Sequence, residues 1–267
     1  MKKSTFLAAF VLVLGAAAAS AADAALTLHI TILGTPQEQL RLSRELIGKM
    51  VAIPTDHRDE RRAAISMVVG HLEAVSRRWP NDSAAIAAAT VLEADFLASP
   101  AVRAYPNAEQ VARRGLALFD KSPTGAILYR ILGLALVGSN RLAEAEQAFA
   151  SAEHHPKLRE LTPLDQLNVW QASAFFYDTY RHDPREAAKR CRAALHISGL
   201  EPMTYMSLAL RSLERSADTD KENARTDLQE LDRLLSESLT KNYSSPADLA
   251  ALKFYQAAAA KYHKKLG

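Results

Sequence analysis

Apolar residues recur every three or four positions along most of this chain, and that spacing is typical of amphipathic helices. The pattern predicts helices over about residues 36–53, 57–79, 84–97, 106–119, 202–217, 222–238 and 246–266. Between the fourth and fifth of these, it predicts helix–turn–helix units at about 125–156 and 164–198. We therefore expect an all-α domain over residues 35–267, with an amphipathic last helix that covers the core of the preceding pair.

Four predicted helix starts share one chemical signature. A residue with a capping oxygen, Thr35, Thr162, Asp183 or Ser245, is followed by proline and then, three residues after the cap, by Glu or Asp. Proline suits the first helical position, and the cap and the carboxylate both face unpaired backbone amides. Capping explains these carboxylates fully, so none is a catalytic candidate.

The unit at residues 125–156 predicts an unusually close helix pair. Gly133 falls mid-helix, where glycine costs about 1 kcal/mol relative to alanine, so its presence indicates a neighbouring helix too close for a side chain. Ala145 and Ala152 supply small residues on the second helix. The intervening turn, Gly138-Ser139-Asn140, offers residues that tolerate a left-handed backbone.

The order of residues in this unit resembles the tetratricopeptide repeat (TPR) family. Tyr129, Leu132-Gly133 and Leu136 are followed by Ala145, Phe149, Ala152 and Pro156. The unit at 164–198 repeats the pattern with Trp170, Ala174 and Tyr177, then Ala187, Cys191 and Ala194. Its turn, Arg181-His182-Asp183, carries one inserted residue. The resemblance covers about seventy residues, and an ordinary antiparallel helical hairpin is the alternative for the first unit alone.

The resemblance implies an α-solenoid whose first helices line a concave groove. Residues that face away from the paired second helix would point into this groove, and their mixture of apolar and polar side chains suits a protein or peptide partner. They are Ile127, Arg130, Leu134, Asn168, Gln171, Phe175 and Asp178. The alternative is that Phe175 packs between units as core and that the polar residues merely solvate the inner face.

The N-terminus predicts export. Lys2 and Lys3 precede an apolar run, and Ala19-Ser20-Ala21 offers a small-x-small cleavage site, so residues 1–21 match a secretory signal peptide. An uncleaved membrane anchor is the alternative. Residues 22–34, where Leu26, Leu28, Ile30 and Ile32 alternate with polar residues, form an extended lead-in. We expect a periplasmic or secreted protein.

Composition narrows the function further. If Lys2 and Lys3 leave with the signal peptide, 31 Lys and Arg remain against 30 Asp and Glu. The mature chain would then lack the excess of basic residues that indicates nucleic acid or an anionic membrane as a partner. Cys191, the single cysteine, falls on a packed helix face and is predicted to be a buried structural thiol.

The sequence contains none of the glycine-rich phosphate loop, HExxH, GxSxG or paired CxxC motifs, so we expect neither catalysis nor a cofactor or metal. Ser238-Leu239-Thr240-Lys241 has SxxK spacing without its companion elements. His154-His155 reads as a solvated loop more readily than as a metal site. The leading hypothesis is a non-catalytic envelope scaffold that binds a protein or peptide. A helical accessory domain of a wall-active enzyme and a small-ligand carrier are the alternatives.

Overall fold

The computed structural model describes residues 34–240, 243 and 245–267, which form eleven α-helices and one short 3-10 helix. The helices are α1 (Pro36–Ala52), α2 (Arg58–Arg78), α3 (Ser83–Ala98), α4 (Tyr105–Phe119), α5 (Pro123–Gly138), α6 (Leu142–Glu153), α7 (Pro163–Thr179), α8 (Pro184–Ala194), α9 (Pro202–Ser216), α10 (Lys221–Leu239) and α11 (Pro246–Leu266). The 3-10 helix η1 (Leu158–Glu160) lies between α6 and α7. The all-α prediction is confirmed for these residues, and η1 was not predicted.

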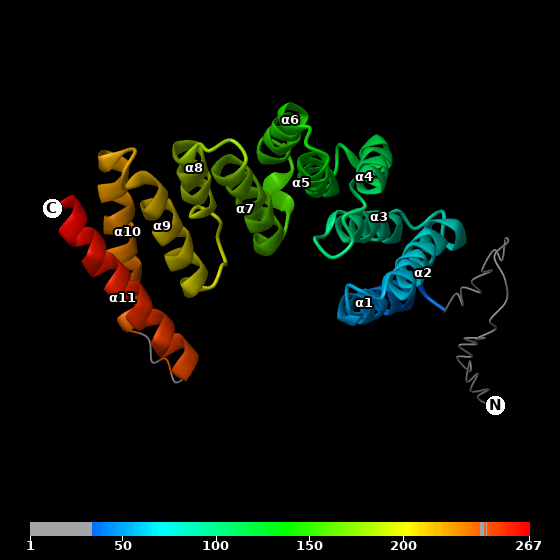
Figure 1. Cartoon of the computed structure of the whole chain (residues 1–267), viewed down its shortest axis with the longest axis horizontal. Helices are drawn as coiled ribbons and strands as arrows, with labels where there is room; N and C mark the ends of the chain where they lie inside the picture. The colour runs from blue at the N-terminus through cyan, green and yellow to red at the C-terminus, as the bar shows by residue number, and fades with distance from the viewer. Residues whose placement is uncertain (1–33, 241–242, 244) are drawn as a thin grey trace.

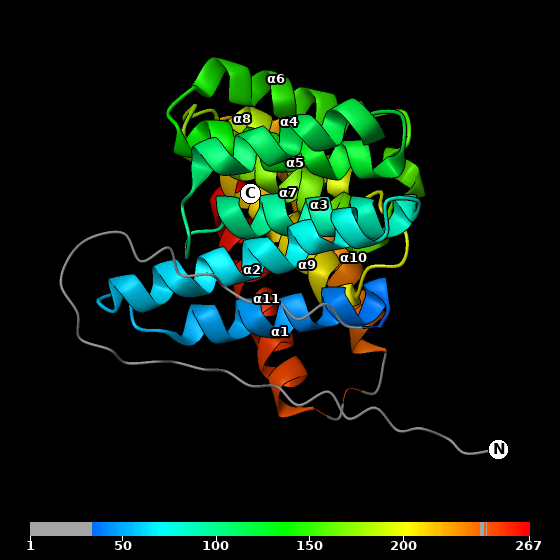
Figure 2. The same ribbon diagram turned by 90° about the vertical axis from the view of Figure 1, so that its right-hand side faces the viewer.

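The helices pack in chain order, an arrangement consistent with a helical repeat. Each contacts its successor, and further contacts join successive odd-numbered helices: α1 to α3, α3 to α5, α5 to α7 and α9 to α11. The described chain forms an arch with α5 and α6 near its crown, α3, α5 and α7 toward its inner side and α11 at one end (Figure 1). Seen from the α1 end, α1 to α6 lie one above another (Figure 2).

Local capping chemistry positions the predicted helix starts. The Thr35 side chain accepts a hydrogen bond from the Glu38 amide, and the Glu38 carboxylate accepts one from the Thr35 amide, which completes a capping box. Thr162 and Asp183 likewise accept from the amides three residues on. The prediction was wrong for Ser245, whose side chain makes no cap hydrogen bond, although Pro246 still opens α11.

Two left-handed residues end the first helices of the two predicted units. Asn140 has φ 58° and His182 has φ 51°. After Asn140 the Arg141 amide donates to Leu136 O at 2.8 Å, which is the long bond of a Schellman cap, whereas around His182 the amides of Arg181 and Asp183 donate to Phe176 O at 3.3 Å and to Tyr177 O at 2.9 Å. The left-handed role proposed for Asn140 is therefore confirmed.

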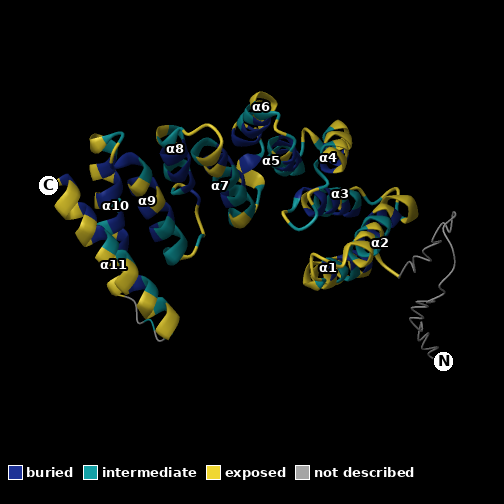
Figure 3. Cartoon of the chain, viewed as in Figure 1, coloured by how far each residue is buried: buried dark blue, intermediate teal, exposed yellow. Residues whose placement is uncertain are grey.

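Close packing at Gly133 is also confirmed. A Cβ atom there would lie 2.7 Å from the Phe149 ring of α6, closer than carbon atoms approach. Phe149 is buried, and its ring lies 5.2 Å from that of Phe176 on α7. This contact joins α5, α6 and α7 within the larger apolar core, which runs from α1 to α7. Buried residues follow the helix seams, and exposed ones lie mainly on outer surfaces and loops (Figure 3).

Arg61 differs from its exposed neighbours Glu60 and Arg62 at the start of α2. Its guanidinium donates to Ile53 O and Ala101 O, each at 2.6 Å. Arg61 thereby ties the α1–α2 loop to the α3–α4 loop. Ala101 lies 40 residues after Arg61, so hydrophobic periodicity does not predict this contact.

The predicted signal peptide at residues 1–21 and nearly all of the 22–34 lead-in, including the alternating residues from Leu26 to Ile32, lie outside the described residues. Among the helices that are described, none combines the length and apolar character needed to cross a bilayer.

Candidate functional site

An apolar pocket of about 350 Å³ lies between the C-terminal parts of α3, α5 and α7. Its walls come from these three helices, the α3–α4 loop, α4 and α6, and comprise Asp95, Ala98, Ser99, Pro100, Tyr105, Leu134, Val137, Gly138, Phe149, Ala172, Phe175, Phe176 and Tyr180. Because most of its lining comes from α3, α5 and α7, three consecutive odd-numbered helices, we call it the inner pocket. Its volume is within the range of ligand pockets.

Phe175 is the most exposed aromatic wall of the inner pocket. Its side chain is 53% exposed, whereas that of Phe176, the next residue, is 1% exposed. The Phe175 ring packs edge-on against Tyr180 at 6.0 Å. The alternative that Phe175 is core between units is therefore wrong, and Phe176 fills that position.

The inner pocket contains two of the seven predicted groove residues, Leu134 and Phe175. Asn168, Gln171 and Ile127 are partly buried and do not line it. Their role in binding stays a prediction. Ile127 packs against the apolar core.

The two charged groove residues already have partners. Arg130, whose side chain is 15% exposed, donates to Asp95 of α3 at 2.7 Å, and Asp178 accepts from Arg215 of α9 at 2.7 Å. The Arg130 guanidinium therefore bridges α5 to α3, and its role in binding, like that of Asp178, stays a prediction. Asp95, at the other end of that bridge, lines the inner pocket and is half exposed.

Sequence reasoning missed Tyr105, Tyr180 and Asp95 as pocket residues. The best available signal was Gly138. A Cβ atom there would lie 2.5 Å from the Tyr105 ring, so glycine lets this ring lie against the end of α5. The sequence pattern had indicated only a turn at Gly138.

Buried polar networks lie between the later helices. The Arg190 guanidinium of α8 donates to Glu153 of α6 at 2.7 Å and to Ser173 of α7 at 2.8 Å, and it lies 3.8 Å from the Tyr177 ring centre. Burial, and then the hydrogen bond to Glu146, raises the pKa of Tyr177 to about 12. This network fixes α8 against the α6–α7 pair.

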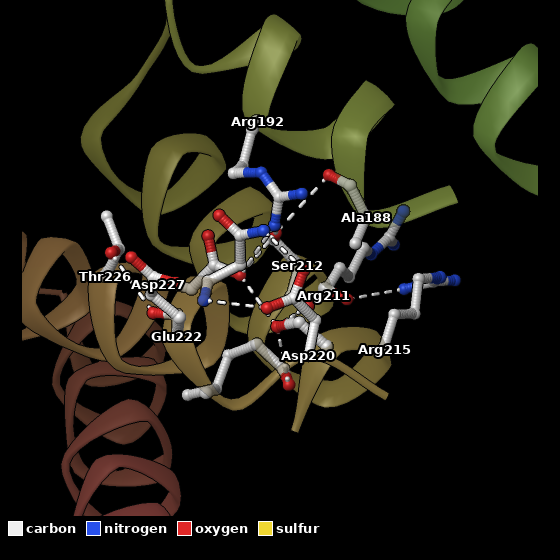
Figure 4. A network of polar contacts seen from close by, with 12 residues as sticks. Ala188, Arg192, Arg211, Ser212, Arg215, Asp220, Glu222, Thr226 and Asp227 are labelled. Atoms are coloured by element: carbon white, nitrogen blue, oxygen red, sulfur yellow. Dashed lines mark hydrogen bonds and ion pairs between the residues drawn. The ribbon is translucent and has the colours of Figure 1, made fainter. Parts of the chain in front are cut away.

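A second network centres on Asp227 of α10 (Figure 4). Its carboxylate accepts hydrogen bonds from Ser212 and Ser216 of α9, at 2.7 and 2.8 Å, and from Arg192 of α8 at 3.1 Å. Burial raises the pKa of Asp227 above its usual value, although the two hydroxyls and the guanidinium oppose that shift. The three donors pair with one buried carboxylate oxygen, so the network serves to hold α8, α9 and α10 together.

The histidine pair differs from the expected solvated loop. His154 is exposed, but His155 is buried: its Nδ1 accepts from the Lys157 amide at 3.2 Å, and its Nε2 donates to Asp120 O at 2.7 Å. These bonds tie the end of α6 to the α4–α5 loop. In the described part of the chain, no group of three or more His, Cys, Asp or Glu side chains is placed to hold a metal ion.

Two other residues that the sequence singled out, Cys191 and Ser238, are buried in the helix packing. Cys191 is buried as predicted, and burial raises the pKa of its thiol. Ser238 is also buried, while Lys241, its SxxK counterpart, lies outside the described residues.

Comparisons of this chain with protein-family models, with curated proteins and with solved structures each found no match.

Proposed function

We propose that this chain is a TPR-like helical-repeat protein that binds a protein or peptide segment in the inner pocket. The architecture supports the repeat assignment. Ala145, Phe149 and Ala152 on α6 are buried, and so are Ala187, Cys191 and Ala194, which lie 42 residues further on α8. The turn that precedes each of these helices contains one left-handed residue, Asn140 or His182.

The observation that carries the binding proposal is the exposure of Phe175 beside Leu134 in an apolar pocket. A half-exposed aromatic ring at a concave site offers apolar area that a partner's side chain can remove from water. Burial of such area contributes about 25 cal/mol per Å² before the costs of association. An apolar anchor residue of the partner fits this chemistry.

Polar groups beside the inner pocket would set the orientation of the partner segment. Asp95 keeps half of its surface exposed while it pairs with Arg130, so its carboxylate retains acceptor capacity for a partner amide. Asn168 and Gln171, on the same helix as Phe175, offer further amide groups. Within this proposal the partner is a segment with an apolar anchor, and the protein meets it after export, in the cell envelope.

Capture of the partner by the mature protein tests the proposal. We expect Phe175→Ala and Leu134→Ala each to reduce recovery of a crosslinked partner from cells, with the thermal midpoint of Phe175→Ala nearly unchanged. Leu164→Ala is the matched control, because Leu164 is 63% exposed on the same helix but does not line the inner pocket. Equal recovery with all three variants would place the partner elsewhere on the protein.

A further inference from the structure

A second pocket, of about 430 Å³, lies between α2, α3 and α4. Its apolar walls include Pro80, Ile86, Val111 and Leu118, and its polar groups come from Glu73, Ser76, Arg77, Thr90, Glu93 and Arg114. None of these residues lines the inner pocket, so the Glu93 pocket is a separate site, independent of the function proposed above.

Glu93 is the distinctive group of this pocket. It is 7% exposed, and within the described residues no hydrogen bond or ion pair joins its carboxyl to another group. Most buried side-chain polar atoms in folded proteins have a hydrogen-bond partner, whereas the Glu93 carboxyl oxygens have none in the described part of the chain and remain accessible to solvent through the pocket. Glu153 and Asp227, by contrast, are similarly buried and accept two or more hydrogen bonds each. The Glu93 carboxyl thus has acceptor capacity directed into an open cavity.

The charged neighbours of Glu93 do not supply that missing partner. On α2, Glu73 and Arg77 lie 3.7 Å apart and pair with each other at the surface. On α4, Arg114 is exposed, and its charge favours the ionised form of Glu93 only weakly. Helices α1 and α5 also contact α3 but contribute no described residue to the pocket.

The balance of these effects disfavours negative charge on Glu93. Burial, followed by repulsion from Glu73, raises the pKa of Glu93 to about 7, and attraction by Arg114 offsets only part of the shift. Near neutral pH the carboxyl therefore populates both protonation states. A cationic hydrogen-bond donor beside it would stabilise the carboxylate.

We propose that the Glu93 pocket binds a primary ammonium group carried on an apolar stem. The ammonium donates to the Glu93 carboxylate inside the pocket, and the stem lies against Ile86, Val111 and Leu118. Both a free alkylamine and a lysine side chain on a peptide carry this chemistry. An anion is disfavoured because its own charge would face the buried carboxyl, while Arg77 and Arg114 are exposed and hydrated.

Binding of the ammonium is coupled to loss of a proton from Glu93. Only the ionised carboxyl pairs with the cation, and that form rises from about a tenth to about nine tenths of the population between pH 6 and pH 8, given a pKa of about 7. The apparent Kd for the cation should consequently fall about tenfold over that interval.

Isothermal titration calorimetry of the full chain with hexylammonium tests this inference. We expect saturable binding, a Kd that falls about tenfold from pH 6 to pH 8, and proton release at pH 6.5 that is revealed by buffers of different ionisation enthalpy. Glu93→Gln should weaken binding at least about tenfold. The control Asp59→Asn, at an exposed position of α2 that does not line the pocket, should change the Kd by less than about threefold.

Three further probes define the ligand class. Hexan-1-ol should bind more weakly than hexylammonium and without pH dependence, and hexanoate should bind more weakly still. Nα-acetyl-lysine methylamide tests whether a lysine side chain enters the pocket from a backbone; tighter binding of this probe identifies a peptide lysine, and tighter binding of hexylammonium identifies a free amine.

The inference is wrong if hexanoate binds more tightly than hexylammonium, since the exposed arginines would then select the ligand. It is equally wrong if Glu93→Gln leaves the hexylammonium affinity unchanged, or if neither ammonium probe binds at all. Circular dichroism of Glu93→Gln verifies that the variant is folded, and an isosteric neutral amide preserves the shape of the protonated acid.

Discussion

The seams around α5 and α6 and those around α8 use different chemistry. Between α5 and α6 a glycine receives an aromatic ring, and Gly133, Phe149 and the small residues of α6 form an apolar seam. Around α8, Arg190 and Arg192 bond to buried acceptors on α6, α7, α9 and α10. Apolar seams depend on shape, whereas polar seams depend on every donor having an acceptor. Substitutions in the apolar and the polar seams should therefore destabilise the protein for different reasons.

Removal of a core aromatic ring from the apolar seam should have the largest effect. Phe176→Ala is expected to lower the free energy of unfolding by about 4 kcal/mol, because it leaves a cavity against Phe149. Phe175→Ala, at the adjacent but half-exposed position, should lower it by less than about 1 kcal/mol. Urea denaturation of both variants makes the comparison, and similar losses would contradict the assignment of Phe176 as core.

A break in the polar seam should cost nearly as much. Arg190→Ala is expected to lower the free energy of unfolding by about 3 kcal/mol or more, because Glu153 would be left buried without its cation. The double variant Arg190→Met with Glu153→Leu should recover most of that loss, since apolar replacements leave no uncompensated charge. A double variant that is less stable than Arg190→Ala would show that shape, not charge pairing, limits this seam.

Glu93 should make the stability of the α2–α4 region depend on pH. Because burial raises its folded-state pKa from 4.5 to about 7, the folded protein holds this proton more tightly than the unfolded chain. This contribution to stability is present below about pH 4.5 and is lost as the pH rises to about 7, with a total loss of up to about 3 kcal/mol. Glu93→Gln should flatten that part of the pH–stability profile and be more stable than the parent at pH 8. An unchanged profile would contradict the pKa assignment.

Glycine substitutions test shape in the apolar seam most finely. Gly133→Ala should destabilise the protein by about 2 kcal/mol, since its Cβ would meet the Phe149 ring. Gly48→Ala is the matched control: Gly48 is also inside a helix, a Cβ atom there would have no neighbour within 4 Å, and alanine should stabilise α1 by about 1 kcal/mol. Thermal midpoints that shift in opposite directions would support close packing at Gly133, and midpoints that shift in the same direction would refute it.

The sequence predicted the apolar seam better than the polar one for a physical reason. Gly133, Asn140 and the prolines act locally, through backbone shape and capping, so their neighbours in sequence reveal their role. Arg190 stands among other charged residues on α8 and reads as solvated, because its acceptor Glu153 lies 37 residues earlier in the chain.

The inner pocket shows the same limit. Leu134 and Phe175 could be predicted from the spacing of two units, but Asp95 and Tyr105 could not, because the alanine-rich α3 does not reveal its register from periodicity. The ion pair of Arg130 with Asp95 depends on the same register. Contacts between helices that are not adjacent in the chain carried the missing information.

Site-specific photocrosslinking tests the central claim, that a partner segment occupies the inner pocket, most directly. A photoreactive benzoylphenylalanine in place of Phe175 should give one crosslinked partner in cells, mapped by mass spectrometry to a single segment, and Leu134→Gln in the same chain should abolish it. The same probe in place of Phe254, which is 61% exposed on α11, should give no such product. Equal crosslinking of the same segment from both positions, or a product at Phe175 that is insensitive to Leu134→Gln, would contradict the claim.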